Sequence, residues 1–333
     1  RGGRQTRGAS HYQGLLLAAL TLDLDHTRSQ IPGRIYLLAQ YTHGRGITED
    51  FIGDTLVISN IDSFQNIAQL SEYWWEVGLL GVDVIFRIGK QDLTSEFLFI
   101  ETAADFLQST FVLSPSTAFP TYPAPSVGAV ALMRLTDSLV LKSGVWDAFA
   151  QGGSWGFSGN DSILLASELE CRYALAGGRL PGVFAVGAVY ESAGKIEERP
   201  VSSVNEYIFQ FEQTIYREHP YDTGDHQGVS VFAGYYPRFP GEQIVEESIG
   251  DSYIAGVVVR GLHPRRDDDV IGGGVAYSQL FRVGTNREAV TEVFYKAQLN
   301  PHLSLQPDLQ YIATPSGIFH DSLAVGLRFQ ITL

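Results

Sequence analysis

The sequence has few of the residues and patterns that mark several classes of protein. Its 333 residues include one cysteine, Cys171, which argues against a disulfide framework or a thiolate metal cluster. No run of about 18 uninterrupted apolar residues occurs, so we expect no membrane-spanning helix. The formal net charge is −14, which argues against nucleic-acid binding because phosphate contacts need clustered Lys and Arg. These absences direct attention to strand patterns.

The clearest pattern is a strict alternation of apolar and polar or small residues at the carboxyl end. Since successive side chains of a strand point to opposite faces, this segment predicts a strand with one apolar wall and one mixed wall. The apolar wall holds Leu323, Val325, Leu327, Phe329, Ile331 and Leu333, and the other wall holds Ala324, Gly326, Arg328, Gln330 and Thr332. We expect the first set to face lipid and Arg328 and Gln330 to face the interior of a barrel.

The same period of two recurs along the whole chain. A soluble β-sandwich would also alternate, and remains the alternative on periodicity alone. The 35 glycines, 19 Phe and 16 Tyr suit many short strands with aromatic residues at membrane interfaces. The alternation and turn signals predict about fifteen strands, over residues 13–25, 33–43, 68–80, 82–92, 126–135, 138–148, 163–175, 182–191, 204–217, 227–238, 249–262, 270–281, 289–299, 302–312 and 322–333.

No charged or Pro/Ser-rich linker divides the strand series, so residues 1–333 read as one domain. Short turns alternate with longer connections, as in bacterial barrels. Such barrels usually have an even strand count because both termini lie in the periplasm. The odd count and the absence of a signal peptide lead us to expect sixteen strands, with the first preceding Arg1.

Two connections are too long and too apolar for ordinary loops. Residues 93–125 contain Phe97, Phe99, Phe106, Phe111 and Phe119 and a helical pattern over 101–108. An apolar loop of this length should pack rather than remain in solvent, so we expect it to fold into the barrel and narrow it. The loop over 44–67 is expected to join it, and its possible mouth residues are Arg45, Glu49, Asp50 and Asp54. For each of these side chains a role in stabilising the loop is an equal alternative.

Two predicted strands suggest a polar interior wall. Glu72, Trp74 and Glu76 share one face of the third strand, and two carboxylates cannot face hydrocarbon cheaply. A tight turn joins this strand to the next, where Arg87 shares a face with Asp83 and Gln91, so we expect Glu72, Glu76 and Arg87 to lie near one another on the wall. Charged groups would offer donors and acceptors to hydroxyls, and Trp74 a flat apolar surface. A solvated salt-bridge wall without solute contacts is the alternative.

Several segments of this chain resemble the OprB family of carbohydrate-selective porins. The amino-terminal matches are Gly2-Gly3, Arg7-Gly8, Tyr12, Gly14, Leu20-Thr21-Leu22-Asp23-Leu24, His43-Gly44-Arg45 and Glu72-Tyr73-Trp74-Trp75-Glu76. Further matches are Arg87-Ile88-Gly89-Lys90, Ser95-Glu96-Phe97, Leu305-Gln306-Pro307-Asp308-Leu309-Gln310-Tyr311-Ile312 and Pro315-Ser316-Gly317. Residues 138–269 match mostly in pattern, and the terminal Leu333 departs from the aromatic residue that usually closes such barrels.

The resemblance implies an all-β, sixteen-stranded transmembrane antiparallel barrel in the bacterial outer membrane, with long extracellular loops folded inward. It implies passive diffusion of small neutral sugars, no cofactor, contact with outer-membrane lipids, and a homotrimer or other envelope proteins as possible partners. We expect the pore contacts to come from Glu72, Trp74, Glu76, Arg87, Ser95, Glu96, Phe106 and Arg45.

Two other functions are weighed against a porin. A barrel hydrolase would need a nucleophile, a histidine and an orienting group together, and Ser322 near His320 and Asp321 is the one local cluster. Adjacent residues on a strand point opposite ways, so we expect no enzyme. A structural barrel that anchors a partner would have a sealed lumen. We expect no metal site from the spacing of the histidines.

Overall fold

The computed structural model describes residues 2–5, 8–25, 31–79, 81–113, 120–148, 155–157, 162–192, 194–196, 199–201, 203–222, 224–240, 248–281 and 287–333. Strands make up most of them, and those from the first half of the chain are β1 (Gln13–Asp23), β2 (Arg34–Gly44), β3 (Ala68–Gly78), β4 (Val84–Gln91), β5 (Ser126–Thr136), β6 (Leu139–Asp147), β7 (Ile163–Ala174) and β8 (Leu180–Glu191). The remaining strands are β9 (Gly194–Ile196), β10 (Arg199–Val201), β11 (Val204–Arg217), β12 (Gly228–Tyr236), β13 (Arg238–Pro240), β14 (Ser248–Arg260), β15 (Val270–Phe281), β16 (Arg287–Asn300), β17 (Leu303–Ala313) and β18 (Ser322–Ile331).

The helical turns are all short. They are η1 (Thr48–Ile52), η2 (Leu93–Ser95), η3 (Glu101–Ala103), α1 (Ser109–Val112), α2 (Leu175–Gly178) and η4 (Pro315–Gly317). Across the described ranges, no helix combines the length and the apolar character needed to cross a membrane.

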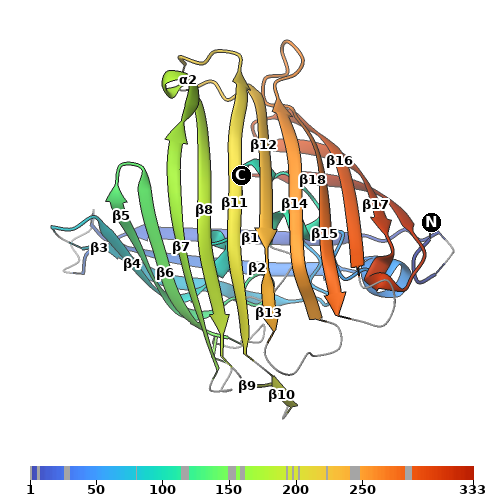
Figure 1. Ribbon diagram of the computed structural model, residues 1–333, viewed down its shortest axis with the longest axis horizontal. Coiled ribbons are helices and arrows are strands. Elements are labelled where there is room, and N and C mark those ends of the chain that lie inside the picture. Colours follow the sequence, from blue (N-terminus) through green and yellow to red (C-terminus); the bar gives the residue numbers. More distant parts are fainter. Residues whose placement is uncertain are drawn as a thin grey trace.

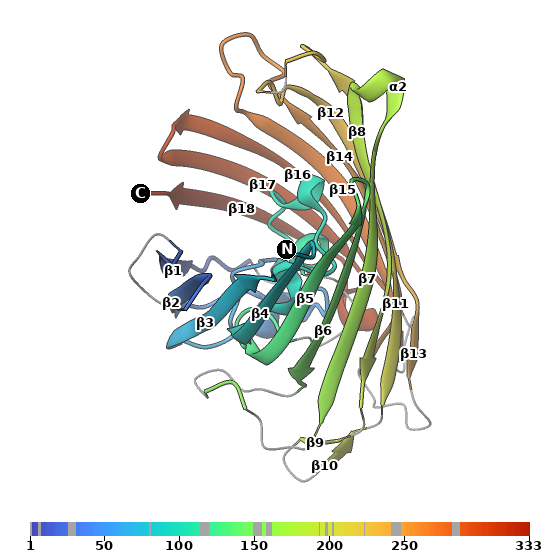
Figure 2. The ribbon, with the colours of Figure 1, turned by 90° about the vertical axis from the view of Figure 1, so that its left-hand side faces the viewer.

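One antiparallel sheet organises the molecule and wraps around the inward loops (Figures 1 and 2). Its strands follow chain order from β1 to β8, continue through β11, β12 and β14, and end at β18, while β13 pairs with β11. This confirms the fifteen predicted strands and the all-antiparallel class. Within the described residues β1 pairs only with β2 and β18 only with β17, so these two strands form the edges of the sheet.

The predicted faces of β18 are confirmed. Leu323, Val325 and Leu327 are 51%, 79% and 68% exposed on the outer face, whereas Ala324 on the other face is 6% exposed. The Arg328 guanidinium donates at 2.5 Å to Asn60 Oδ1 in the loop over residues 45–67, which we call the first inward loop. Arg328 therefore points to the interior, as the alternation requires.

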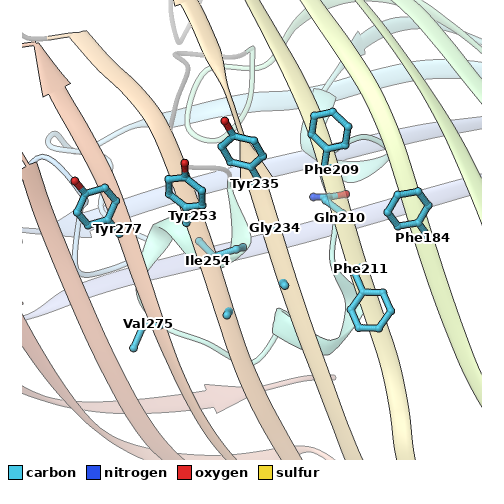
Figure 3. Close-up of a pocket in the computed structure, with 12 residues that line it drawn as sticks. Phe184, Phe209, Gln210, Phe211, Gly234, Tyr235, Tyr253, Ile254, Val275 and Tyr277 are labelled. Carbon is cyan, nitrogen blue, oxygen red and sulfur yellow. The ribbon is translucent and has the colours of Figure 1, made fainter.

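Aromatic side chains gather on the outer face of the middle of the sheet. The rings of Phe209, Tyr235, Tyr253 and Tyr277 come from neighbouring strands β11, β12, β14 and β15 and lie side by side (Figure 3). Tyr235 and Tyr253 are stacked with centroids 4.6 Å apart. Outward rings next to inward polar residues such as Gln210 are the pattern of a transmembrane barrel wall.

The loop from β4 to β5 folds inward, as predicted. Phe97 and Phe106 are fully buried, and Phe106 packs against Phe111 of the same loop and against Phe232 and Phe294 of the wall. Phe119 lies outside the described residues. The helix predicted over 101–108 is wrong: the chain makes only the η3 turn there and then runs irregularly, because its side chains and backbone bind the wall instead.

Carboxylates on the interior wall hold the backbone of both inward loops. Glu292 on β16 accepts the N–H groups of Leu107 and Gln108 at 2.8 and 2.9 Å. Glu288, four residues earlier on the same face of β16, accepts those of Thr55 and Leu56, both at 2.9 Å. A carboxylate that accepts two backbone donors satisfies groups that an irregular loop would otherwise bury unpaired. These contacts keep the loops inside the barrel.

Candidate functional site

The tight turn between β3 and β4 sets a charged pair on the interior wall. The strand register places Glu76 directly opposite Arg87, so both side chains share one face. Arg87 Nε and Nη2 donate to Glu76 Oε2 at 2.9 and 2.7 Å. The sequence predicted this pair, and it forms because a short connection fixes the register.

Arg87 also connects the wall to the inward loop. Its Nη2 lies 2.8 Å from Glu96 Oε1, just after the η2 turn of that loop. Its guanidinium carbon lies 4.3 Å from the centroid of the Trp74 ring, in cation–π contact. The side chain of Arg87 is only 7% exposed and that of Glu96 23%. Arg87 therefore positions Glu96 and Trp74, which are more accessible than Arg87 itself.

Two residues of β2 that the sequence alone does not identify complete this group. Arg34 Nη2 lies 2.7 Å from Glu76 Oε1, and its side chain is 49% exposed. Tyr36 stacks on Trp74 with ring centroids 4.7 Å apart. They alternate with apolar residues in the sequence, but the 23-residue connection from β2 to β3 leaves the register undetermined. We call Arg34, Tyr36, Trp74, Glu76, Arg87 and Glu96 the Arg87 patch.

The stacking contacts alter the expected role of Trp74. With Tyr36 on its ring and the Arg87 guanidinium over it, Trp74 shares its surface with two protein groups. A solute at this wall would therefore meet a combined aromatic and guanidinium surface rather than a bare indole face.

Glu72 borders the Arg87 patch, because its side chain contacts Trp74 and interacts with Arg87, as expected. Glu72 also accepts the Asp92 N–H at 3.3 Å, where the inward loop begins. The other predicted site residues make their described contacts outside the patch. Ser95 donates to the Asp92 carbonyl at 2.8 Å. Phe106 is fully buried in the aromatic cluster and offers no surface to a solute. Arg45 pairs with Asp50 at 3.2 Å within the first inward loop, and its side chain is 60% exposed.

Two aspartates in the loops have altered ionisation. Burial raises the pKa of Asp54 well above its ordinary value, and the charge of Glu288 raises it further. Asp54 Oδ1 has no hydrogen-bond partner among the described residues. Burial also raises the pKa of Asp92, although the hydrogen bonds from Thr94 and Tyr122 oppose the shift. Both residues lie in the loops, outside the Arg87 patch.

The described residues offer little support for a metal site or for a hydrolase. No group of three or more His, Cys, Asp or Glu able to hold a metal occurs within the described ranges. In the carboxyl-terminal cluster, the Asp321 carboxylate accepts hydrogen bonds from the Tyr311 hydroxyl at 2.5 Å and the Thr314 N–H at 3.0 Å. Asp321 therefore holds the turn that precedes β18 and does not orient a histidine. Ser322 is only 3% exposed, so a substrate could not reach its hydroxyl.

Comparisons with known proteins agree with this architecture. The family model described as carbohydrate-selective porin, OprB family, matches residues 7–333. The high-pH structure of Pseudomonas putida OprB superposes with a TM-score of 0.84 at 18% identity, covering 99% of this chain and 90% of that one. Its low-pH structure gives a TM-score of 0.64 at 16% identity, over 96% and 85% of the two chains.

The match to a curated relative covers a smaller part of both chains. Porin AaxA of Chlamydia abortus is 26% identical over 211 residues, which cover 60% of this chain and 42% of that porin. The match thus spans less than half the length of that relative. The family that matches nearly the whole chain is one of channels rather than enzymes. The chain therefore belongs to the OprB family, the carbohydrate-selective porins of the bacterial outer membrane.

Proposed function

We propose that this chain forms a passive channel for small neutral sugars and that the Arg87 patch is its narrowest polar contact zone. The observation that carries the proposal is the link between Arg87 of the wall and Glu96 of the inward loop at 2.8 Å, beside the stacked Tyr36 and Trp74 rings. It supports a constriction because the loop reaches the wall at that point.

The chemistry of the patch suits sugars. A sugar presents hydroxyls that both donate and accept hydrogen bonds and a ring face that is largely apolar. Arg34 and Glu96 are accessible donor and acceptor groups, and the two aromatic rings add an apolar surface. Conduction needs binding that is weak enough for release, which several modest contacts satisfy better than one tight site.

Liposome swelling tests the proposal. Phospholipid vesicles carrying the channel should swell faster in a neutral hexose than in an oligoethylene glycol of similar mass, which has few hydroxyl donors, or in a hexuronate. Swelling rates that depend on solute mass alone would contradict sugar selectivity. Vesicles that admit no solute would instead favour a sealed, structural barrel.

The proposed function includes no catalytic step. Its partners are neutral sugars in the lumen of the barrel and outer-membrane lipids around the outer face.

We also propose a homotrimer. It is supported by the aromatic outer face of β11 to β15, which would pack against another copy as readily as against lipid. Native mass spectrometry should detect three copies. A monomer at every detergent concentration would contradict the trimer.

A further inference from the structure

A cavity of about 440 Å³ lies between the inward loop and the wall formed by β5 to β8 and β11. Its roof is the loop over residues 95–101. Its wall includes Lys142, which follows the short turn at 137–138, and Arg172, which precedes the turn containing α2. We call it the short-turn cavity. It is closer than Arg87 to the end of the barrel where short turns connect β5 to β6 and β7 to β8.

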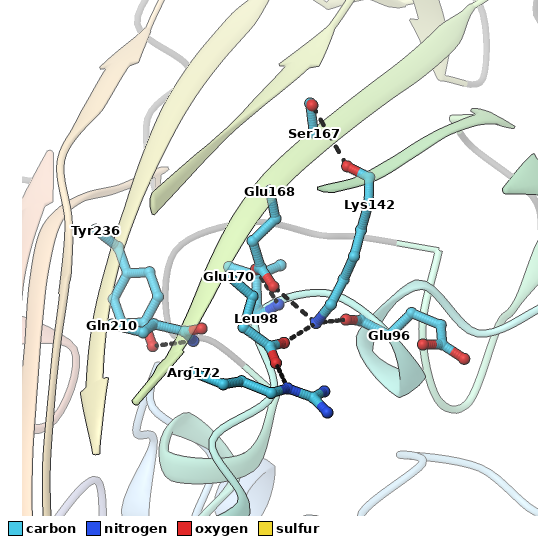
Figure 4. A network of polar contacts seen from close by, with 9 residues as sticks. All are labelled: Glu96, Leu98, Lys142, Ser167, Glu168, Glu170, Arg172, Gln210 and Tyr236. Carbon is cyan, nitrogen blue, oxygen red and sulfur yellow. Dashed lines mark hydrogen bonds and ion pairs between the residues drawn. The ribbon is translucent and has the colours of Figure 1, made fainter. Parts of the chain in front are cut away.

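An ion network fixes the wall of this cavity (Figure 4). The Lys142 ammonium binds the Glu96 carbonyl at 2.8 Å, Glu168 Oε1 at 3.0 Å and Glu170 Oε2 at 2.8 Å. These three contacts use all three N–H donors of the ammonium. Glu168 also accepts the Leu98 N–H at 3.1 Å. Lys142 is therefore a structural group that holds the loop against the wall.

Arg172 differs from Lys142 in accessibility. Its side chain is 62% exposed, and the one described contact of its guanidinium joins Nε to Glu170. A guanidinium has five N–H donors, so four have no described protein partner. On the loop, Phe99 is 46% exposed and Glu101 is exposed. Donors, an acceptor and an apolar ring thus line one space.

The charge of the cavity restricts what it can accept. Three cations, Lys142, Arg172 and the Arg87 that pairs with Glu96, stand against five carboxylates, a formal charge of −2. The carboxylates are those of Glu96, Glu101, Glu168, Glu170 and Glu212. An anionic solute would be repelled from such a lining, while a neutral polyhydroxylated solute can use both the donors and the acceptors.

We propose that the short-turn cavity is a second sugar-binding station, in which Arg172 donates to sugar hydroxyls and Phe99 packs against the ring. It rests on the proposed function, since it takes the same solutes. Glu96 joins the two stations: its carboxylate pairs with Arg87 and its carbonyl binds Lys142. A sugar leaving the Arg87 patch next meets Arg172, and anionic sugars are excluded there.

Single-channel recording with glucose added to one chamber at a time tests the station. Arg172→Gln and Phe99→Ala should each weaken glucose block about fivefold when glucose is added on the short-turn side, and not when it is added on the other side. A fivefold change corresponds to the loss of one modest contact. Arg172→Lys keeps the charge but loses the planar fork, so it should weaken block from that side with an unchanged reversal potential. Arg134→Gln, at an exposed pair with Asp83 outside the cavity, is the control.

Glucuronate should block at least fivefold more weakly than glucose from the same side. The station is refuted if Arg172→Gln and Phe99→Ala both retain the parent's block constants from both sides, and the charge argument is refuted if glucuronate blocks as well as glucose. A parent channel that glucose blocks from neither side would instead refute the proposed function, so the two failures are distinguishable.

Discussion

Replacing Arg87 by Ala should make the channel more selective for cations. Arg87 contacts Glu76 at 2.7 Å and Glu96 at 2.8 Å. After the substitution Arg34 still pairs with Glu76, but no other cation pairs with the Glu96 carboxylate among the described residues. The wall then loses one positive charge and exposes one unopposed carboxylate.

The size of the effect follows from Coulomb's law. A unit charge roughly 6 Å from a permeating ion contributes about 0.7 kcal/mol in water, and screening near 0.1 M salt lowers this to about 0.4 kcal/mol. Cations gain this amount and anions lose it. The resulting difference of about 0.8 kcal/mol changes the cation-to-anion permeability ratio about fourfold.

The reversal potential of single channels under a KCl gradient measures this ratio. Arg134→Ala removes the same charge from an exposed pair, 57% and 59% exposed, and should change the ratio less than about twofold. Arg87→Lys keeps the charge and should keep the parent's ratio. If Arg87→Ala shifts the reversal potential no more than Arg134→Ala, Arg87 does not lie at the constriction.

Three further changes test the loops and the outer wall. Phe106→Ala should destabilise the barrel by about 3–5 kcal/mol because it empties the centre of the aromatic cluster, whereas Phe99→Ala on the same loop should cost less than about 1 kcal/mol; urea unfolding in lipid vesicles compares them, and equal losses would contradict the packing. The raised pKa of Asp54 means that the folded state binds its proton more tightly than the unfolded chain, so stability should fall as pH rises from the ordinary Asp value of about 3.9 through the raised pKa. Asp54→Asn should flatten that pH dependence of unfolding and stabilise the channel at neutral pH by about 1–3 kcal/mol, and an unchanged pH profile would reject the assignment. Leu327→Arg, which places a charge on the outer face, should cost about 2–4 kcal/mol in refolding into vesicles, and a neutral effect would contradict the lipid-facing assignment.

The faces of the strands could be predicted from the sequence because side-chain direction repeats every two residues. The alternation from Leu323 onward was enough to place Arg328 inside, and the short turn after β3 was enough to bring Glu76 to Arg87. Arg34 and Tyr36 could not be placed, because the register of β2 on β3 depends on how the first inward loop folds.

Other residues of the site were missed for different reasons. The sequence predicts Phe106 near the solute, but an apolar ring on an inward loop gains more by packing against Phe232 and Phe294 than by lining water. Glu168, Glu170 and Arg172 alternate with Leu169 and Cys171, so the polar face of β7 was visible in the sequence. Their contact with Lys142 and the loop backbone required the three-dimensional register.

The most direct test of a sugar constriction at the Arg87 patch is glucose block of single-channel current in Trp74→Ala, with Trp75→Ala as the matched control. Trp75 lies on the opposite face of the same strand and donates to the Pro32 carbonyl at 2.9 Å. Trp74→Ala should weaken glucose block severalfold and leave the reversal potential unchanged, because it removes an aromatic surface and no charge. Glucose should block the Trp75→Ala channel as strongly as it blocks the parent. Equal glucose block in the parent and Trp74→Ala would contradict the assignment of the constriction to this wall.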